Sequence, residues 1–137
     1  MASLPAPARS APSIASPAGS AAALRTFFNI ARAWNLTPAQ EQRLLGVQRS
    51  TLYAWRAGNF PARLDADTLE RLSYLFGIYG ALNVLFPLAE RADAWLRRPN
   101  SAPLFGGDTA LSRMLGGQVA DLFEVRLYLD AVRGGGS

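Results

Sequence analysis

Hydrophobic residues recur every three or four positions along most of the chain after residue 23, which is the spacing of one face of an α-helix. Between Leu24 and Trp34, for example, Phe27 and Ala31 fall on the same side as both ends. The alternation of polar and apolar residues that is typical of strands is missing, while alanine, leucine and arginine, which favour helices, are abundant. The pattern therefore predicts an all-α fold.

Start and stop signals divide this region into seven helical segments. Thr37 followed by Pro38 is a typical helix start, and Gly46 is a typical helix end. The sequence DTLE at residues 67–70 has the spacing of a capping box and is expected to open the fourth helix. We predict helices over residues 24–34, 38–45, 49–57, 67–86, 87–97, 109–115 and 118–132.

The two ends of the chain differ in composition from the region between them. Residues 1–22 consist almost wholly of alanine, proline and serine, and the last five residues read RGGGS. Such segments bury too little apolar surface to offset the entropy of ordering them. We expect a disordered arm over residues 1–22 and a flexible glycine-rich tail.

The composition excludes several kinds of chemistry. The chain has no cysteine and no histidine, so it lacks thiolate ligands, a cysteine nucleophile and the commonest general base and metal ligand. Some acidic residues remain as catalytic candidates, but their spacing fits helix capping better. They are Asp65, Asp67, Glu70 and Asp108. We therefore expect no catalytic residue, no metal site, no cofactor and no enzyme activity.

Charge is distributed unevenly along the sequence. Up to residue 63 there are seven arginines and one acid, Glu41, which gives a net charge of +6. From residue 64 onward there are seven arginines and nine acids, which gives −2. All 14 basic residues are arginine, although GC-rich genomes also favour arginine codons. The imbalance predicts two surfaces with different partners, and the basic half favours nucleic acid.

The expected location follows from what the sequence lacks. No uninterrupted apolar run is long enough to span a bilayer. The first residues also do not show the charged and then apolar order of a secretory signal. We expect a cytoplasmic protein with no membrane partner.

The segment LLGVQRSTLYAWRAG at residues 44–58 has the features of a helix-turn-helix, with Gly46 at the turn. On a helical wheel, Leu52 lies on one side of the second helix, and Arg49 and Arg56 lie on the opposite side. Arginine, glutamine and hydroxyl side chains suit base edges and phosphates in a major groove. The candidate DNA-binding residues are Gln48, Arg49, Ser50, Thr51, Tyr53 and Arg56. A tight corner between packed helices with a solvated arginine face is the alternative.

The run GVQRSTLYAW resembles the helix-turn-helix of Xre-type bacterial regulators, with Gln42 where that pattern prefers a small residue. The later segment resembles the toxin-binding domain of the MbcA/ParS/Xre antitoxin family. The matching features are Trp95-Leu96, Pro99-Asn100, Phe105-Gly106, a short capped helix, a Gly116-Gly117 turn and a final Val/Leu-rich helix. Ala110 stands where the family usually has proline. Together the resemblance covers residues 24–135.

This resemblance implies an antitoxin that binds a RES-domain toxin, an enzyme that consumes NAD or transfers ADP-ribose, and that represses its own operon by binding operator DNA. A stand-alone dimeric Xre-like regulator without a toxin is the alternative. The candidate toxin-binding residues are Trp95, Arg97, Arg98, Asn100, Phe105, Arg126 and Arg133. Trp95 and Phe105 are equally typical of a core, as is the final helix, which carries two apolar stripes.

The apolar run LSYLFGIYGALNVLF at residues 72–86 is larger than one face of a small bundle requires, so we expect it to form a homodimer. The expected architecture is an N-terminal helix-turn-helix bundle followed by a small helical toxin-binding and dimerisation domain. Its parts are the arm (1–22), the helix-turn-helix domain (23–63), the central dimerisation helices (64–87) and the toxin-binding domain with its tail (88–137).

Overall fold

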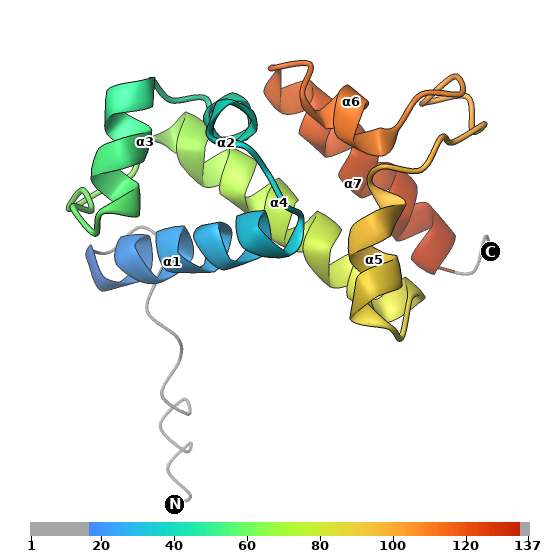
Figure 1. Cartoon of the computed structure of the whole chain (residues 1–137), viewed down its shortest axis with the longest axis horizontal. Coiled ribbons are helices and arrows are strands. Elements are labelled where there is room, and N and C mark those ends of the chain that lie inside the picture. Colours follow the sequence, from blue (N-terminus) through green and yellow to red (C-terminus); the bar gives the residue numbers. More distant parts are fainter. Residues whose placement is uncertain (1–16, 135–137) are drawn as a thin grey trace, which may run out of the picture.

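The computed structural model describes residues 17–134 of the chain, and within that range it is all-helical, as predicted. A single isolated bridge between Pro99 and Thr109 is the only β-type pairing there. The helices are α1 (Pro17–Ala33), α2 (Pro38–Leu45), α3 (Arg49–Arg56), α4 (Ala66–Leu85), α5 (Ala89–Trp95), α6 (Ala110–Met114) and α7 (Val119–Arg133). Figure 1 shows α4 running through the middle of the molecule, with α1, α2 and α3 to one side and α5, α6 and α7 to the other.

The first helix is longer than the sequence pattern predicted. α1 begins at Pro17, so residues 17–22, which we assigned to the disordered arm, are helical. Residues 21–23 are alanine, the residue with the highest helix propensity, and Ser20 and Ala23 are buried against the rest of the fold. The remainder of the predicted arm (1–16) and the last residues of the predicted tail (135–137) lie outside the described residues.

α4 is buried on more of its surface than a surface helix would be. Leu72, Leu75, Ile78 and Leu82 are fully inaccessible to solvent. α7 packs along α4, and the two approach closely at Gly77, where an added Cβ would overlap the Arg126 guanidinium. Much of the apolar run that we expected to dimerise is therefore covered within the chain.

The start of α4 differs from the prediction. The residue that caps it is Asp65, whose carboxylate accepts a hydrogen bond from the Thr68 backbone N–H at 2.8 Å. The backbone and hydroxyl hydrogen bonds from Thr68 hold the pKa of Asp65 below its usual value. Asp67, which we expected to open the helix, instead accepts a bond from Arg71. The predicted helix start at DTLE is therefore two residues too late, because α4 already begins at Ala66 with Asp65 as its capping residue.

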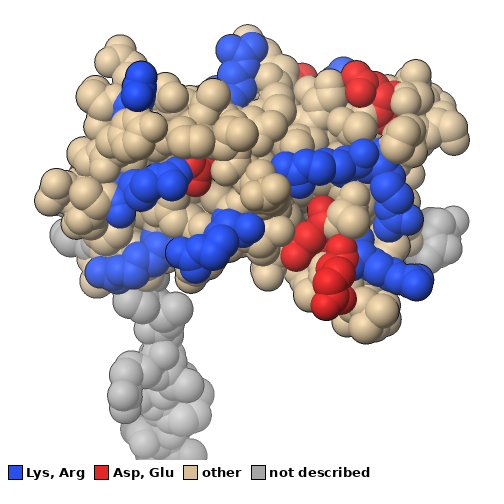
Figure 2. Space-filling view, viewed as in Figure 1, with Lys and Arg blue, Asp and Glu red and all other residues tan. Residues whose placement is uncertain are grey.

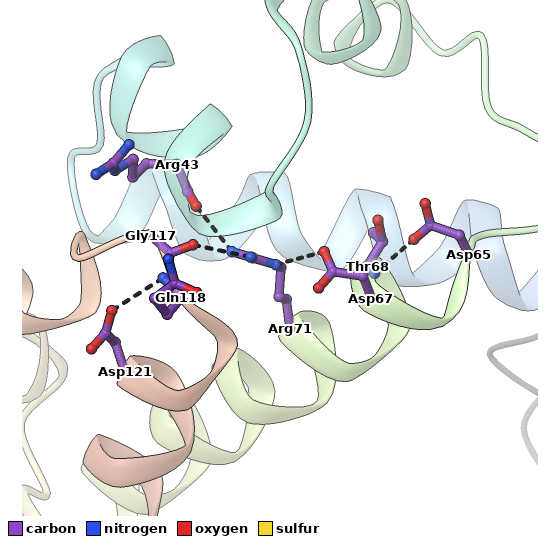
Figure 3. Close-up of polar contacts among 8 residues, drawn as sticks. All are labelled: Arg43, Asp65, Asp67, Thr68, Arg71, Gly117, Gln118 and Asp121. Atoms are coloured by element: carbon purple, nitrogen blue, oxygen red, sulfur yellow. Dashed lines mark hydrogen bonds and ion pairs between the residues drawn. The ribbon is translucent and has the colours of Figure 1, made fainter.

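The buried side chain of Arg71 connects three parts of the chain (Figure 3). Its guanidinium donates to Asp67 Oδ2 at 2.8 Å, to the Arg43 carbonyl at the end of α2 at 3.3 Å, and to the Gly117 carbonyl before α7 at 3.1 Å. Arg43 adds a bond from its Nε to the Leu115 carbonyl at 2.9 Å. A charge removed from water is stabilised only when its donors are satisfied, and here three acceptors satisfy it.

Gly46 and Gly58 allow the backbone strain of a glycine-to-alanine change to be distinguished from a steric clash with Arg71. Both have a left-handed backbone, with φ of +68° and +94°. A Cβ on Gly46 would lie 2.7 Å from Arg71 Nε, whereas a Cβ on Gly58 would meet nothing within 4 Å. We predict that Gly58→Ala lowers the free energy of unfolding by about 1–2 kcal/mol, and that Gly46→Ala lowers it by at least about 1 kcal/mol more because it also displaces Arg71.

Urea denaturation of the two variants provides the measurement. Equal losses for Gly46→Ala and Gly58→Ala would contradict a stabilising role for Arg71 at this junction.

Candidate nucleic-acid interface and partner-binding surface

α2, the following turn and α3 form the helix-turn-helix that the sequence predicted. Leu44, Leu45 and Leu52 are fully buried and hold the two helices together. Thr37 caps α2, and its side chain accepts from the Gln40 backbone N–H. Gly46 ends α2 in the left-handed conformation, which a residue without a Cβ adopts at least cost. These contacts fix the angle at which α3 leaves the turn.

The outer face of α3 carries most of the predicted DNA-binding residues. Gln48, Arg49, Ser50 and Tyr53 are exposed, and Thr51 is half-buried. The Arg49 guanidinium lies 5.3 Å from the centre of the Tyr53 ring. α3 contains no acidic residue. This face therefore offers guanidinium, phenol, amide and hydroxyl groups to a polyanion.

Arg56 is placed differently from the other candidates. Its guanidinium forms an ion pair with the carboxylate of Glu41 and lies 5.5 Å from the centre of the Phe28 ring. Glu41 is only 3% exposed, and it is the one acid of the basic half of the chain. A buried carboxylate needs a counter-charge, so Arg56 is held against the domain. The lone acid was the signal in the sequence that could have indicated this pairing.

In the second half of the chain, Trp95 and Phe105 lie in an aromatic cluster with Tyr128 of α7. The Trp95 and Phe105 rings are 5.9 Å apart, and Phe105 and Tyr128 are 5.2 Å apart, both edge to face. Phe105 is buried and Trp95 is half-buried. Both therefore fix the loop before α6 onto α7, which was the alternative role that the sequence left open.

Three further toxin-binding candidates have partners within the chain. Arg97 donates to the carbonyls of Trp34 and Asn35, at 2.5 and 3.0 Å, and so connects the end of α5 to the end of α1. The Asn100 side chain accepts from the Ala102 backbone N–H at 2.9 Å and shapes its own loop. Arg126 pairs with Asp130 at 2.9 Å, one turn along α7.

The remaining two candidates, Arg98 and Arg133, are exposed. The Arg98 guanidinium lies 5.8 Å from the centre of the Phe86 ring, while Arg133 lies at the end of α7. Neither has an ion-pair partner within residues 17–134. Of the seven predicted toxin-binding residues, these two are the ones whose charge remains directed to solvent.

An exposed apolar surface on α7 was missing from the candidate residues. Phe123 and Leu127 are 44% and 56% exposed, unlike the buried stripe of Leu122, Val125 and Leu129 on the same helix. Val132, which is 46% exposed, continues that buried side at the end of the helix. The Phe123 ring contacts Tyr74 of α4 at 5.6 Å between centroids. The Tyr74 hydroxyl donates to Glu70, which raises the pKa of Tyr74. The second apolar stripe of the final helix was visible in the sequence, but its exposure was not.

Residues 17–134 lack the features of a membrane span and of a metal site. No helix in that range is both long and apolar enough to cross a bilayer. The same residues contain no group of acidic side chains close enough to bind a metal ion.

Comparison with known proteins matches both halves of the chain. Residues 13–77 match the antitoxin Xre-like helix-turn-helix domain, and residues 81–135 match the antitoxin Xre/MbcA/ParS C-terminal toxin-binding domain. A similar protein is uncharacterized protein y4oB of Sinorhizobium fredii (strain NBRC 101917 / NGR234). It is 48% identical over 115 residues, which are 83% of this chain and 86% of that protein.

The contact between Arg56 and Glu41 gives a stability prediction. Arg56→Ala leaves a buried carboxylate without its counter-charge, so we expect it to lower the free energy of unfolding by about 2–3 kcal/mol. Arg49→Ala removes an exposed arginine of the same helix and should change it by less than about 0.5 kcal/mol. Adding Glu41→Leu to Arg56→Ala should recover most of the loss. Equal urea midpoints for the two single variants would show that Arg56 is not structural.

Proposed function

The chain belongs to the Xre/MbcA/ParS family of antitoxins, and we propose that it neutralises a RES-domain toxin and represses its own operon by sequence-specific DNA binding. The toxin-binding domain of the family accounts for residues 81–135, and the helix-turn-helix domain accounts for residues 13–77. In this proposal the protein acts by binding and not by catalysis, in the cytoplasm of its bacterium.

The observation that carries the proposal is the separation of two unlike surfaces. α3 presents an acid-free face with Arg49 and Tyr53, and it lies at the opposite end of the molecule from α7 (Figure 1). α7 presents Phe123 and Leu127, which are large apolar side chains left in water. The α3 surface suits the base edges and phosphates of a DNA groove, and the α7 surface suits a protein partner.

For DNA binding, we propose that α3 enters the major groove with Arg49 nearest the base edges. Arginine can donate two hydrogen bonds to one guanine, which is the commonest specific contact of this kind. Gln48, Ser50 and Tyr53 flank it on the exposed surface. Two such helices in a homodimer would read half-sites about one helical turn, roughly 34 Å, apart.

For toxin binding, we propose that the exposed α7 stripe forms the apolar centre of the contact. Arg98 and Arg133 supply positive charge in the same half of the chain. Trp95 and Phe105 contribute indirectly, because they hold the loop before α6 in place against α7. Aromatic and apolar residues at the centre with arginine nearby are typical of protein interfaces.

The same α7 stripe favours a second candidate function. Two copies of the chain could bury Phe123 and Leu127 against each other, which would make a stand-alone dimeric regulator with no toxin. The two functions differ in whether the purified protein, without a toxin, already buries this stripe in a dimer. Size-exclusion chromatography with light scattering distinguishes them, because Leu127→Arg would convert a dimer formed through α7 into a monomer.

The DNA-binding proposal predicts a loss at Arg49. Arg49→Ala should weaken binding to the DNA upstream of the gene by about 1–3 kcal/mol, because one bidentate base contact is lost. Gel-shift titrations at a fixed salt concentration measure this, with scrambled duplex for comparison. Arg91→Ala, an exposed arginine on α5, is the matched control and should bind like the wild type. Unchanged affinity in Arg49→Ala would remove this residue from the base-reading set.

The toxin-binding proposal predicts a separate loss on α7. Co-expression of the full chain with the neighbouring toxin-like reading frame should keep cells growing, and Leu127→Arg should remove most of this protection by placing a charge in an apolar contact. Leu88→Arg changes an equally exposed leucine just before α5 and should protect like the wild type. Protection by Leu127→Arg equal to that by Leu88→Arg would exclude α7 from the contact. A neighbouring frame that is harmless alone would favour the stand-alone regulator.

A further inference from the structure

A cleft of about 490 Å³ lies between α1 and α3, beside the predicted recognition surface. Three arginines line it, two from α1 and one from α3, together with the aromatic rings of Phe28, Trp55 and Phe60. The arginines are Arg25, Arg32 and Arg56. The cleft therefore combines positive charge with apolar walls, and the recognition helix forms one of its sides.

The exposed side of α1 is a polar stripe. Arg25, Asn29 and Arg32 are four and three residues apart, so their side chains leave the helix on one face, and all three are exposed. Leu24, Phe27 and Trp34, which face the core, are buried. α1 contains no acidic residue along its length. Figure 2 shows basic side chains gathered over α1 and the adjoining part of α3.

The charge of Arg25 and Arg32 is not neutralised within the described part of the chain. The only carboxylate that lines the cleft is Glu41, and it is already paired with Arg56. Arg25 rests on the Phe60 ring, with its guanidinium 5.1 Å from the ring centre, and this contact leaves its charge in place. Between residues 17 and 134, neither Arg25 nor Arg32 has an ion-pair partner.

We propose that Arg25 and Arg32 bind the phosphodiester backbone of the same duplex whose major groove receives α3. This inference rests on the proposed DNA binding, and it adds α1 to an interface that the sequence confined to α3. Guanidinium groups donate two parallel hydrogen bonds to a phosphate, and the Asn29 amide can donate between them. Arg25 and Arg32 are about 10 Å apart along the axis of α1, which is the axial rise of about three phosphates of one strand.

A duplex fits these features better than a free nucleotide does. The polar stripe of α1 exposes Arg25, Asn29 and Arg32 over about two turns of the helix. A small ligand would contact only the concave part of the cleft. Trp55 and Arg56 belong to α3, so the cleft is continuous with the face that carries Arg49 and Tyr53. The DNA strand at the edge of the major groove that receives α3 would therefore lie beside α1.

The test is the salt dependence of duplex binding by the full chain. Fluorescence anisotropy of a labelled 30-base-pair duplex, with the upstream sequence or a scrambled one, is measured for wild type, Arg25→Ala, Arg32→Ala and the control Arg91→Ala over a range of salt concentrations. Each phosphate contact contributes about 0.9 to the slope of log K against log salt. We expect Arg25→Ala and Arg32→Ala each to reduce the slope by about one and to weaken both duplexes by the same factor, with Arg91→Ala unchanged.

The possible results separate this inference from the proposed function. If Arg25→Ala and Arg32→Ala keep the wild-type slope of log K against log salt and still bind the upstream sequence specifically, the α1 contact is wrong and the proposed function stands. Loss of preference for the upstream sequence in either variant would also overturn the α1 contact, because a phosphate contact does not read bases. Saturable binding of AMP that these variants abolish, with duplex slopes unchanged, would make the cleft a nucleotide site instead. Absence of any specific duplex binding by the wild type would overturn the proposed function as well.

Discussion

The fold depends on a single buried guanidinium, that of Arg71, at the point where three segments of the chain meet. α4 supplies the side chain, the end of α2 supplies one carbonyl and the turn before α7 supplies another (Figure 3). Asp67 supplies the negative charge. Because a buried cation is costly unless its donors are satisfied, these three segments can only pack together in a narrow range of positions.

This constraint connects the two halves of the molecule. Arg43 donates from α2 to the Leu115 and Gly116 carbonyls, and Arg97 donates from the end of α5 to two carbonyls at the end of α1. In each case an arginine of one half holds the backbone of the other. The helix-turn-helix and the proposed toxin-binding surface are therefore parts of one packed body. Hydrogen bonds connect the end of α2 to the turn that precedes α7, the helix on which a protein partner would bind.

Periodicity and capping residues allowed most of the fold to be predicted, because a helix is specified by local sequence. The all-α class and the Gly46 turn follow from such signals. What the sequence could not show depends on residues far apart in the chain. The pairing of Arg56 with Glu41 joins α3 to α2, and the hydrogen bond from Arg97 to the Trp34 carbonyl joins the end of α5 to the end of α1, so neither contact follows from a local pattern. Helical wheels place side chains on faces, but they do not show which face another helix covers.

Native-state hydrogen exchange tests whether arginine-to-carbonyl bonds make the two halves one cooperative unit. The amides of Leu52 in α3 and Leu129 in α7 are both in fully packed positions. We expect both amides to open with the same free energy in the wild type, and Arg71→Ala to lower both opening free energies by the same amount. Opening of α7 at a much lower free energy than α3, or a loss confined to one of them in Arg71→Ala, would contradict this cooperativity.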